Sequence, residues 1–297
     1  MIGMPNICLN RWIALYCFWP LGREASTASR RIPILMYHSI SRDPERGVAS
    51  YYRLCTSPNV FRQQMSWLHE RGYRTVNAAG LDPLALGSSP RDPFVVITFD
   101  DGFRDNLEEA LPVLEQFGFS ATVYLATAYI RDKRRSFRGR DCLTWSEVRE
   151  MQARGVRFGS HTVNHPVLHE LGWRDIEAEI RDSKSLLEDQ IQTEVTSFAY
   201  PYAFPQEDST YVARLREMLQ TAAYRDCMTT MIGRPTLEDD PYLLKRLAVN
   251  SDDDPLSFKA KVEGAYDWMG CVQTGVRRLK GLCRRRITSC SETRGAS

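Results

Sequence analysis

The chain has 297 residues, of which 43% are hydrophobic and 26% are charged, and its formal net charge is +2. This composition is typical of a soluble globular protein, and a parallel α/β barrel of this length forms a single domain. A nucleic-acid-binding chain usually shows a strong basic bias along its fold, and none precedes residue 277, so no nucleic-acid partner is expected.

The first thirty residues are expected to form an extension ahead of the folded domain. An apolar stretch at residues 12–19 follows Arg11 and precedes Pro20. A helix needs roughly 20 apolar residues to span a bilayer, so this stretch is too short to do so. Three interpretations stay open: a secretion signal cleaved near residues 25–28, an uncleaved interfacial anchor, or a start assigned too far upstream.

Short apolar runs and amphipathic runs alternate from about residue 31. Strands are predicted over residues 32–37, 73–76, 94–99, 121–125, 156–159, 196–200, 227–229 and 243–249. Helices are predicted to begin near residue 57, over 106–117, from 144 to about 154, over 174–190 and over 212–219. Strands that alternate with helices pair in parallel. About seven repeats without an internal linker therefore predict one closed barrel, assigned to residues 31–270.

The last segment, residues 271–297, is predicted to be a basic tail. Residues 277–286 contain six Lys and Arg residues and no acidic residue. Such a run fits a peripheral contact with an anionic membrane or a polyanionic glycan, or a tail that is simply solvated.

Polar side chains follow four of the predicted strands, each at the point where the strand ends. They are His38, the pair Asp100 and Asp101, His161, and the segment 200–202. Residues at the carboxyl ends of barrel strands face one mouth, where the active sites of such barrels lie. We therefore expect these separate segments to form a single site.

One carboxylate and two imidazoles suffice for a metal site with open coordination positions. The spacing of His161 and His165 lets both rings reach one ion beside Asp101. Catalytic zinc and non-haem iron both use sets of this kind. A hydrolase also needs a base beside the metal, and the second carboxylate, Asp100, favours that alternative over an oxygenase.

Three motifs resemble those of the polysaccharide deacetylases, the NodB-type family also called carbohydrate esterase family 4. They are residues 98–102 (Thr-Phe-Asp-Asp-Gly), 160–165 (Ser-His-Thr-Val-Asn-His) and 199–202 (Ala-Tyr-Pro-Tyr). The resemblance spans residues 31–250 and implies a distorted (β/α)7 barrel. It also implies hydrolysis of N-acetyl groups, occasionally O-acetyl groups, from N-acetylhexosamine units of a glycan or glycolipid.

The resemblance also implies roles for individual residues. Asp101, His161 and His165 would hold a divalent metal, usually zinc, with cobalt or nickel as substitutes. Asp100 would be the general base, and the Tyr202 amide would stabilise the oxyanion. Tyr200 and Pro201 would shape the substrate-binding turn.

This chain departs from the family pattern in two places that affect catalysis. Ala199 stands where many members have an arginine that orients the base. Arg246 is the candidate for the missing charge, and it is also expected to be a substrate-binding residue. No histidine follows His169, so the late histidine that serves as general acid is absent. His38 is the candidate replacement, since a similar Tyr-His element occurs in the biofilm-polysaccharide branch; the alternative is a histidine that buttresses the first loop.

Two other functions remain as alternatives: hydrolysis of a small non-sugar amide, or sugar binding by a catalytically decayed member of the family. Tyr202, Phe204 and Trp145 are expected to be exposed near the mouth, where they would stack on sugar rings. The compartment also has two interpretations. Eight scattered cysteines without a Cys-x-x-Cys pair favour reduced thiols and a cytoplasmic or peripheral membrane location, whereas family precedent favours the cell envelope.

Overall fold

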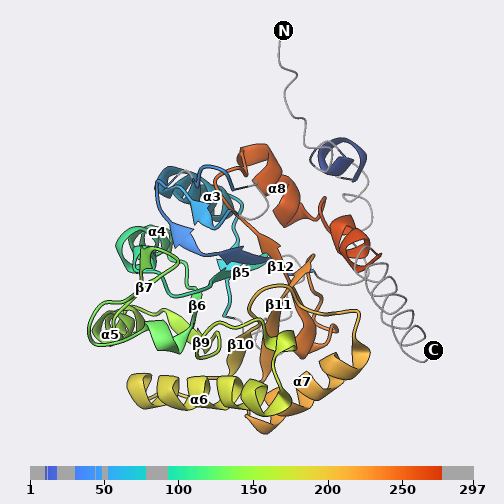
Figure 1. Cartoon of the computed structure of the whole chain (residues 1–297). Helices are drawn as coiled ribbons and strands as arrows, with labels where there is room; N and C mark the ends of the chain where they lie inside the picture. Colours follow the sequence, from blue (N-terminus) through green and yellow to red (C-terminus); the bar gives the residue numbers. More distant parts are fainter. Residues whose placement is uncertain are drawn as a thin grey trace, which may run out of the picture.

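Seven parallel strands form a closed barrel with helices around it (Figure 1). The computed structural model describes residues 11, 13–18, 31–43, 45–48, 53–77 and 93–275. Within these ranges the strand order is β1–β12–β11–β10–β9–β6–β5, and β5 pairs with β1 to close the ring. The strand β4 lies outside the ring and pairs with the start of β5. The predicted single-domain (β/α)7 barrel is therefore confirmed.

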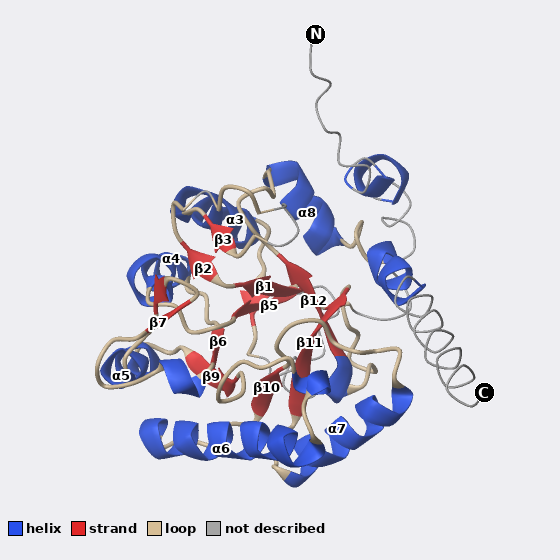
Figure 2. Cartoon of the chain, in the orientation of Figure 1, coloured by secondary structure: helices blue, strands red, loops and turns tan. Residues whose placement is uncertain are grey.

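The elements follow the chain in alternation, as Figure 2 shows. The barrel strands are β1 (Ile34–Tyr37), β5 (Phe94–Phe99), β6 (Thr122–Leu125), β9 (Arg157–Ser160), β10 (Ser197–Ala199), β11 (Asp226–Ile232) and β12 (Leu244–Ala248). The short outer strands are β2 (Ser39–Ile40), β3 (Cys55–Thr56), β4 (Arg74–Thr75), β7 (Ser136–Phe137) and β8 (Arg140–Asp141). The α-helices are α3 (Pro58–Glu70), α4 (Leu111–Phe117), α5 (Trp145–Ala153), α6 (Trp173–Ile191), α7 (Ser209–Thr221) and α8 (Pro255–Glu263). Single turns lie at Ala14–Phe18, Asn106–Ala110, Thr127–Tyr129, Leu168–Glu170 and Pro241–Leu243.

The barrel has separate inner and outer apolar layers because successive side chains of a strand point to opposite faces. Ile34 and Val96 belong to a small cluster inside the ring, together with Tyr124 and Met228. Val95, between the helices and the ring, belongs to the much larger outer cluster. The inner cluster fills the ring interior, so the polar residues that follow the strands lie above a packed floor.

The predicted elements are found close to their expected bounds, with one helix altered. Thr144 and Glu147 form the expected capping box at the start of α5. The predicted helix 106–117 begins instead with a π-helical turn, Asn106–Ala110, which continues into α4. Pro112 explains this change, because it has no N–H to bond the carbonyl four residues earlier. The helix α8 and the short strands β2, β3, β7 and β8 were not predicted.

Several expectations concern the chain ends and the cysteines. Most of the segments 1–30 and 271–297, including the basic run 277–286, lies outside the described residues. No helix in the described ranges is long and apolar enough to cross a membrane. The five cysteines that the structure describes are all unpaired.

Candidate metal centre and active site

The two adjacent carboxylates lie at the carboxyl end of β5, and both are buried. The Asp100 amide donates to the Tyr37 carbonyl oxygen at 3.0 Å, which continues the pairing with β1. Asp101 then turns into the left-handed region, with φ of 75°. Neighbouring strand residues normally point to opposite faces, so this turn lets both carboxylates reach the mouth. Gly102 is also left-handed, and a Cβ atom there would lie 2.5 Å from Leu125 Cδ2, so the motif glycine is needed for space as well as for conformation.

The ring of His161 is oriented by a backbone contact. His161 follows β9 directly, and its Nδ1 lies 2.7 Å from the Ala199 carbonyl oxygen, which accepts its N–H. The second nitrogen, Nε2, therefore carries no proton in the neutral ring and faces the two aspartates. It lies 3.6 Å from Asp101 Oδ1 and 4.0 Å from Asp100 Oδ2.

The loop that carries His165 is held by a carboxylate from a different element. Glu179 on α6 accepts hydrogen bonds through Oε2 from the amides of Val163 at 2.8 Å and Asn164 at 2.9 Å. Its Oε1 accepts from the Asn164 side chain at 2.6 Å. Thr162 and His165 both have left-handed backbones, with φ of 69° and 54°. Each such residue costs of order 1–3 kcal/mol, so external bonds of this kind are needed to hold the loop.

Asp101, His161 and His165 converge on one point. One ligand atom from each lies within 4.8 Å of the others, and His165 Nε2 is 3.2 Å from Asp101 Oδ1. Tetrahedral ligands at zinc distances lie about 3.3 Å apart, so the spacing fits such an ion. Asp101 Oδ1 is buried without a conventional hydrogen-bond partner among the described residues, as a metal ligand would be.

The protonation states at this point also suit a metal. Burial lowers the pKa of His161 to about 4, so its ring is neutral at pH 7. Burial raises the pKa of Asp101, but its contacts with the neighbouring histidines outweigh that effect, and the net pKa is well below the ordinary value. Ligands must be deprotonated to bind a metal, and both groups meet that condition.

Asp100 is held by Arg246 in a two-pronged ion pair. Arg246 Nη1 donates to Oδ1 at 2.7 Å, and Nη2 donates to Oδ2 at 2.8 Å. Arg246 lies on β12, is fully buried, and also donates through Nε to the Thr229 carbonyl oxygen at 3.0 Å. Burial raises the pKa of Asp100, but the adjacent charge of Arg246 and the neighbouring histidines lower it by more. The net pKa of Asp100 therefore lies below the ordinary value. Arg246 therefore supplies beside Asp100 the positive charge that Ala199 does not.

Tyr202 lies at the rim beside His165. Its backbone is left-handed, with φ of 57°, and its side chain is 41% exposed. The Tyr202 ring packs 4.6 Å from the His165 ring. Thr230 donates to the Tyr202 carbonyl oxygen at 2.9 Å, which fixes the orientation of this turn.

The comparisons with known proteins agree with this geometry. The sequence model of the family described as "Polysaccharide deacetylase" matches residues 87–220. A Bacillus subtilis (strain 168) protein described as putative polysaccharide deacetylase YxkH is 30% identical over 78% of this chain and 76% of its own length. The chain belongs to the polysaccharide deacetylase family. As a polysaccharide deacetylase, it is a hydrolase that acts on non-peptide carbon–nitrogen bonds.

Two further deacetylases show how far the likeness extends. The poly-β-1,6-N-acetyl-D-glucosamine N-deacetylase of Escherichia coli (strain K12) is 29% identical over 49% of this chain but only 23% of its own length. The Streptococcus pyogenes deacetylase PplD, solved in complex with acetate, superposes with a TM-score of 0.66 at 25% identity. That match covers 79% of this chain and 99% of PplD.

His38 follows β1 at the mouth of the deacetylase barrel and is half-buried. Its carbonyl oxygen accepts a hydrogen bond from the Asn106 side chain at 2.8 Å. Burial lowers the pKa of His38, and Asp101 and Asp100 offset that effect only in part. The ring is therefore mainly neutral at pH 7, so His38 must take up a proton before it can donate one.

The structure corrects the expectation for several aromatic residues. Trp145 and Phe204 are buried in the outer core, so neither is an exposed stacking surface. Tyr200 is also buried, with its hydroxyl 3.2 Å from that of Tyr211. Pro201 and Arg246 are buried as well, so these predicted substrate-binding residues support the site from beneath, and Tyr202 alone of the predicted aromatics reaches the surface.

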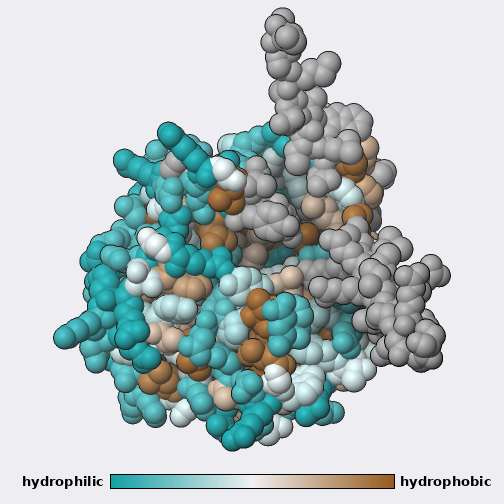
Figure 3. Space-filling model, in the orientation of Figure 1, coloured by the Kyte–Doolittle hydropathy of each residue, from teal (hydrophilic) through white to brown (hydrophobic). Residues whose placement is uncertain are grey.

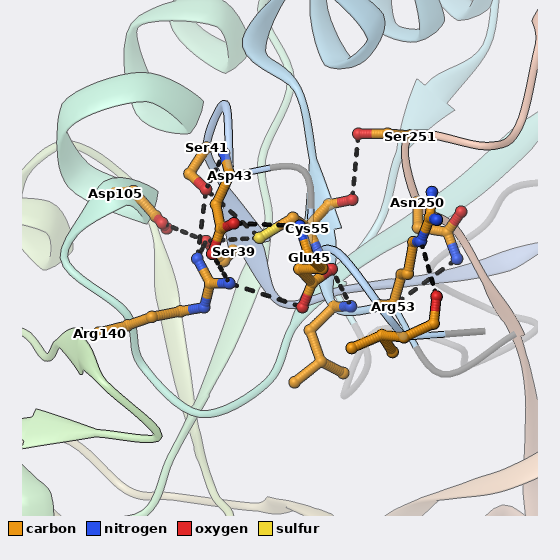
Figure 4. Close-up of polar contacts among 12 residues, drawn as sticks. Ser39, Ser41, Asp43, Glu45, Arg53, Cys55, Asp105, Arg140, Asn250 and Ser251 are labelled. Carbon is orange, nitrogen blue, oxygen red and sulfur yellow. Dashed lines mark hydrogen bonds and ion pairs between the residues drawn. The ribbon is translucent and has the colours of Figure 1, made fainter. Parts of the chain in front are cut away.

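A polar network ties the His38 loop to the rest of the mouth (Figure 4). Arg140, on the β7–β8 hairpin, contacts Asp43 at 2.7 Å and Ser39 Oγ at 3.3 Å. Ser39 in turn donates to Asp105, which follows the aspartate motif. Glu45 accepts hydrogen bonds from the backbone amides of Leu54 and Cys55, where β3 begins. The network therefore joins the first loop, the hairpin and the aspartate motif into one rim.

Proposed function

We propose that this deacetylase removes N-acetyl groups from N-acetylhexosamine units of an acetylated glycan or glycolipid. The pairing of Asp100 with Arg246, beside the convergent Asp101, His161 and His165, carries this proposal. It supplies a base that stays ionised next to a metal site. Relatives described as poly-β-1,6-N-acetyl-D-glucosamine N-deacetylase and chitooligosaccharide deacetylase support the substrate class.

Asp101, His161 and His165 would hold the metal, and we propose zinc because its preferred ligands and geometry match this set. When bound, zinc would act as a Lewis acid and favour ionisation of water at neutral pH. Asp100 and Arg246 are left outside this set, which leaves Asp100 available to move a proton.

The remaining steps use the side chains of the mouth. Asp100 accepts a proton from the attacking water as the new carbon–oxygen bond forms at the acetyl carbonyl. The Tyr202 amide donates to the developing oxyanion. As the carbon–nitrogen bond breaks, the amine needs a proton, and His38 delivers the proton that Asp100 took from the water, so the step needs no outside acid. Acetate and the free amino sugar are the products.

A chelator experiment tests the function directly. We expect acetate release from N-acetylglucosamine oligomers to be lost after chelation and restored by zinc, with cobalt and nickel as comparisons. Asp101→Ala is expected to lose both the metal and the activity. Acetate release that survives complete metal removal would contradict the proposal, and so would release only from small non-sugar amides.

A further inference from the structure

A short basic segment lies between β6 and α5, at residues 131–141. It contains six basic and two acidic residues. The basic residues are Arg131, Lys133, Arg134, Arg135, Arg138 and Arg140, and the acidic residues are Asp132 and Asp141. Acidic residues elsewhere reduce the net charge of the chain to +2, so overall composition hides this concentration of positive charge.

The basic segment is attached to the metal site. It contains the β7–β8 hairpin, and Arg104, just after the aspartate motif, donates from its amide to the Asp141 carbonyl oxygen at 2.8 Å. On the other side of the hairpin, the Phe137 ring lies 5.2 Å from the His165 ring and 4.3 Å from the Tyr129 ring. The hairpin is therefore part of the mouth rather than a remote loop.

Arg138, at the tip of the hairpin, is placed at the rim by two aromatic rings. The central carbon of its guanidinium lies 5.2 Å from the centroids of both Phe137 and Tyr202. Contacts at this distance are cation–π interactions, which hold the charge in place while leaving its donors accessible. Both rings also pack on His165. The exposed Arg138 charge therefore lies next to the rings that surround the metal ligand.

The positive charge of this segment is only partly neutralised. Arg134 pairs with Glu147 at 2.7 Å, and Arg140 pairs with Asp43 at 2.7 Å. The other four cations have no acidic side-chain partner within the described ranges: Arg131, Lys133, Arg135 and Arg138. Asp132 and Asp141 are the opposing charges within the segment. In the view of Figure 3 the flank near α5 and β7 is largely hydrophilic.

We propose that the mouth recognises an anionic glycan, in which carboxylate or phosphate groups lie near the acetylated sugar. This inference rests on the proposed deacetylation and adds the charge of the substrate to it. A guanidinium binds carboxylate and phosphate through paired donors, and a patch of one sign raises the local concentration of oppositely charged substrate. Arg138 would contact the anionic group, and Arg131, Lys133 and Arg135 would attract the chain.

The test compares kcat/KM on N-acetylglucosamine-containing oligosaccharides of matched length. One is neutral, one alternates with a uronic acid, and one carries phosphodiesters. At about 50 mM salt we expect kcat/KM to be about tenfold higher on the charged oligosaccharides, and this gap to shrink at about 500 mM, where screening is stronger. The better of the two charged substrates identifies whether carboxylate or phosphate is recognised.

Matched variants assign the effect to the segment. Arg138→Gln is expected to lower the ratio of charged to neutral kcat/KM about threefold, mainly through KM, and Arg138→Lys to lower it less. The combined Lys133, Arg135 and Arg138→Gln variant is expected to remove most of the preference. Arg225→Gln makes the same change in charge at an exposed position before β11, at the opposite end of the barrel, and is expected to keep the preference.

Equal kcat/KM on neutral and charged substrates, insensitive to salt, would overturn the inference. If no oligosaccharide releases acetate, the proposed deacetylation is contradicted, and calorimetric binding of the same oligosaccharides to the zinc-loaded protein then tests the inference alone. Tighter binding of the charged oligosaccharides that weakens in Arg138→Gln would sustain it, and equal binding would reject it.

Discussion

Two buried aspartates at opposite ends of the barrel have pKa values shifted in opposite directions. Asp100, at the mouth, is 2% exposed, and Asp226, at the start of β11 on the floor, is 4% exposed. Burial raises the pKa of both carboxyl groups. The net pKa of Asp100 is nevertheless lowered, because Arg246 lies against it, whereas the pKa of Asp226 is raised to about 7.

The neighbours of the two residues explain the contrast. Asp226 accepts a hydrogen bond from the Ser197 hydroxyl at 2.5 Å, and its second oxygen has no hydrogen-bond partner among the described residues. A neutral hydroxyl offsets only part of the cost of burying a charge, while a paired guanidinium reverses it. Burial alone therefore yields a carboxyl group that is only partly ionised at neutral pH, whereas the fixed charge of Arg246 keeps Asp100 ionised.

The largest expected effect comes from removing the carboxylate at the mouth. Asp100→Asn is expected to lower kcat by about 10²–10⁴-fold, the usual contribution of a general base, while the metal content stays stoichiometric. Asp226→Asn makes the same chemical change on the floor and is expected to keep kcat. Steady-state acetate release and metal analysis of both variants measure this, and equal losses in the two would remove the functional distinction.

The next largest effect is expected from removing the positive charge of Arg246, which lowers the pKa of Asp100. Arg246→Gln leaves Asp100 buried without its counter-charge, which is expected to cost about 3–5 kcal/mol of unfolding free energy. The pKa of Asp100 should rise, so the acidic limb of the kcat/KM profile should move to higher pH. Lys245→Gln, at the half-exposed neighbouring position, is the control. An acidic limb that stays in place in Arg246→Gln would show that Asp100 does not depend on this pair.

The contribution of Asp226 to the unfolding free energy should depend on pH with the opposite sign to that of Asp100. Between its ordinary pKa of 3.8 and its folded pKa of about 7, Asp226 binds a proton in the folded state and releases it on unfolding. Its contribution to the unfolding free energy should therefore fall by up to about 1.4 kcal/mol per pH unit as the pH rises through this window. Asp100 has a lowered pKa, so its contribution is present above its ordinary value and lost as the pH falls through the folded pKa.

Urea unfolding of the wild type and of Asp226→Asn from about pH 4 to pH 8 measures this slope. The difference in unfolding free energy between the two proteins should change across the window and level off above it. A constant difference would mean that Asp226 is ionised throughout.

The smallest expected effect concerns the loop that carries His165. Glu179→Ala removes three hydrogen bonds from residues 163 and 164 and is expected to weaken metal affinity about tenfold, as loss of an outer support usually does. Glu177→Ala, at an exposed position on the same helix, is the control. Chelator competition measures the affinity, and an unchanged affinity in Glu179→Ala would show that the loop holds its shape without this clamp.

The barrel and the meeting of the two motifs were predictable because both depend on local signals. The run Phe94–Phe99 is apolar or β-branched throughout, as a strand buried on both faces requires, and the two aspartates follow its carboxyl end. Parallel topology then places Asp101 and His161 at the same mouth without any further information. The left-handed turn at Asp101, however, which brings both carboxylates to one side, has no clear sequence signal apart from the following glycine.

Long-range pairs and side-chain direction were harder to predict. Arg246 was proposed from the sequence as the missing charge, but only the structure shows that it points inward at Asp100. Glu179 was missed among the glutamates of α6, although its position directly before the buried Ile180 is a signal that it borders the buried face. Trp145 was expected to be exposed near the mouth, but as the first residue of a capped helix it packs into the core.

The separation of Asp100 and Arg246 along the chain also has a consequence during translation. The two residues are 146 positions apart, and Arg246 lies on β12, the last barrel strand to be synthesised. At about 5–20 residues per second, a ribosome needs roughly 7–30 s to extend the chain from the first to the second. By the later part of that interval Asp101, His161 and His165 have been synthesised, while Asp100 still lacks its counter-charge. We therefore expect hydrolytic competence to arise only after the last barrel strand has been made. A ribosome stalled between codons 165 and 246 would hold a nascent chain that contains Asp101, His161 and His165 but lacks the charge that keeps Asp100 ionised.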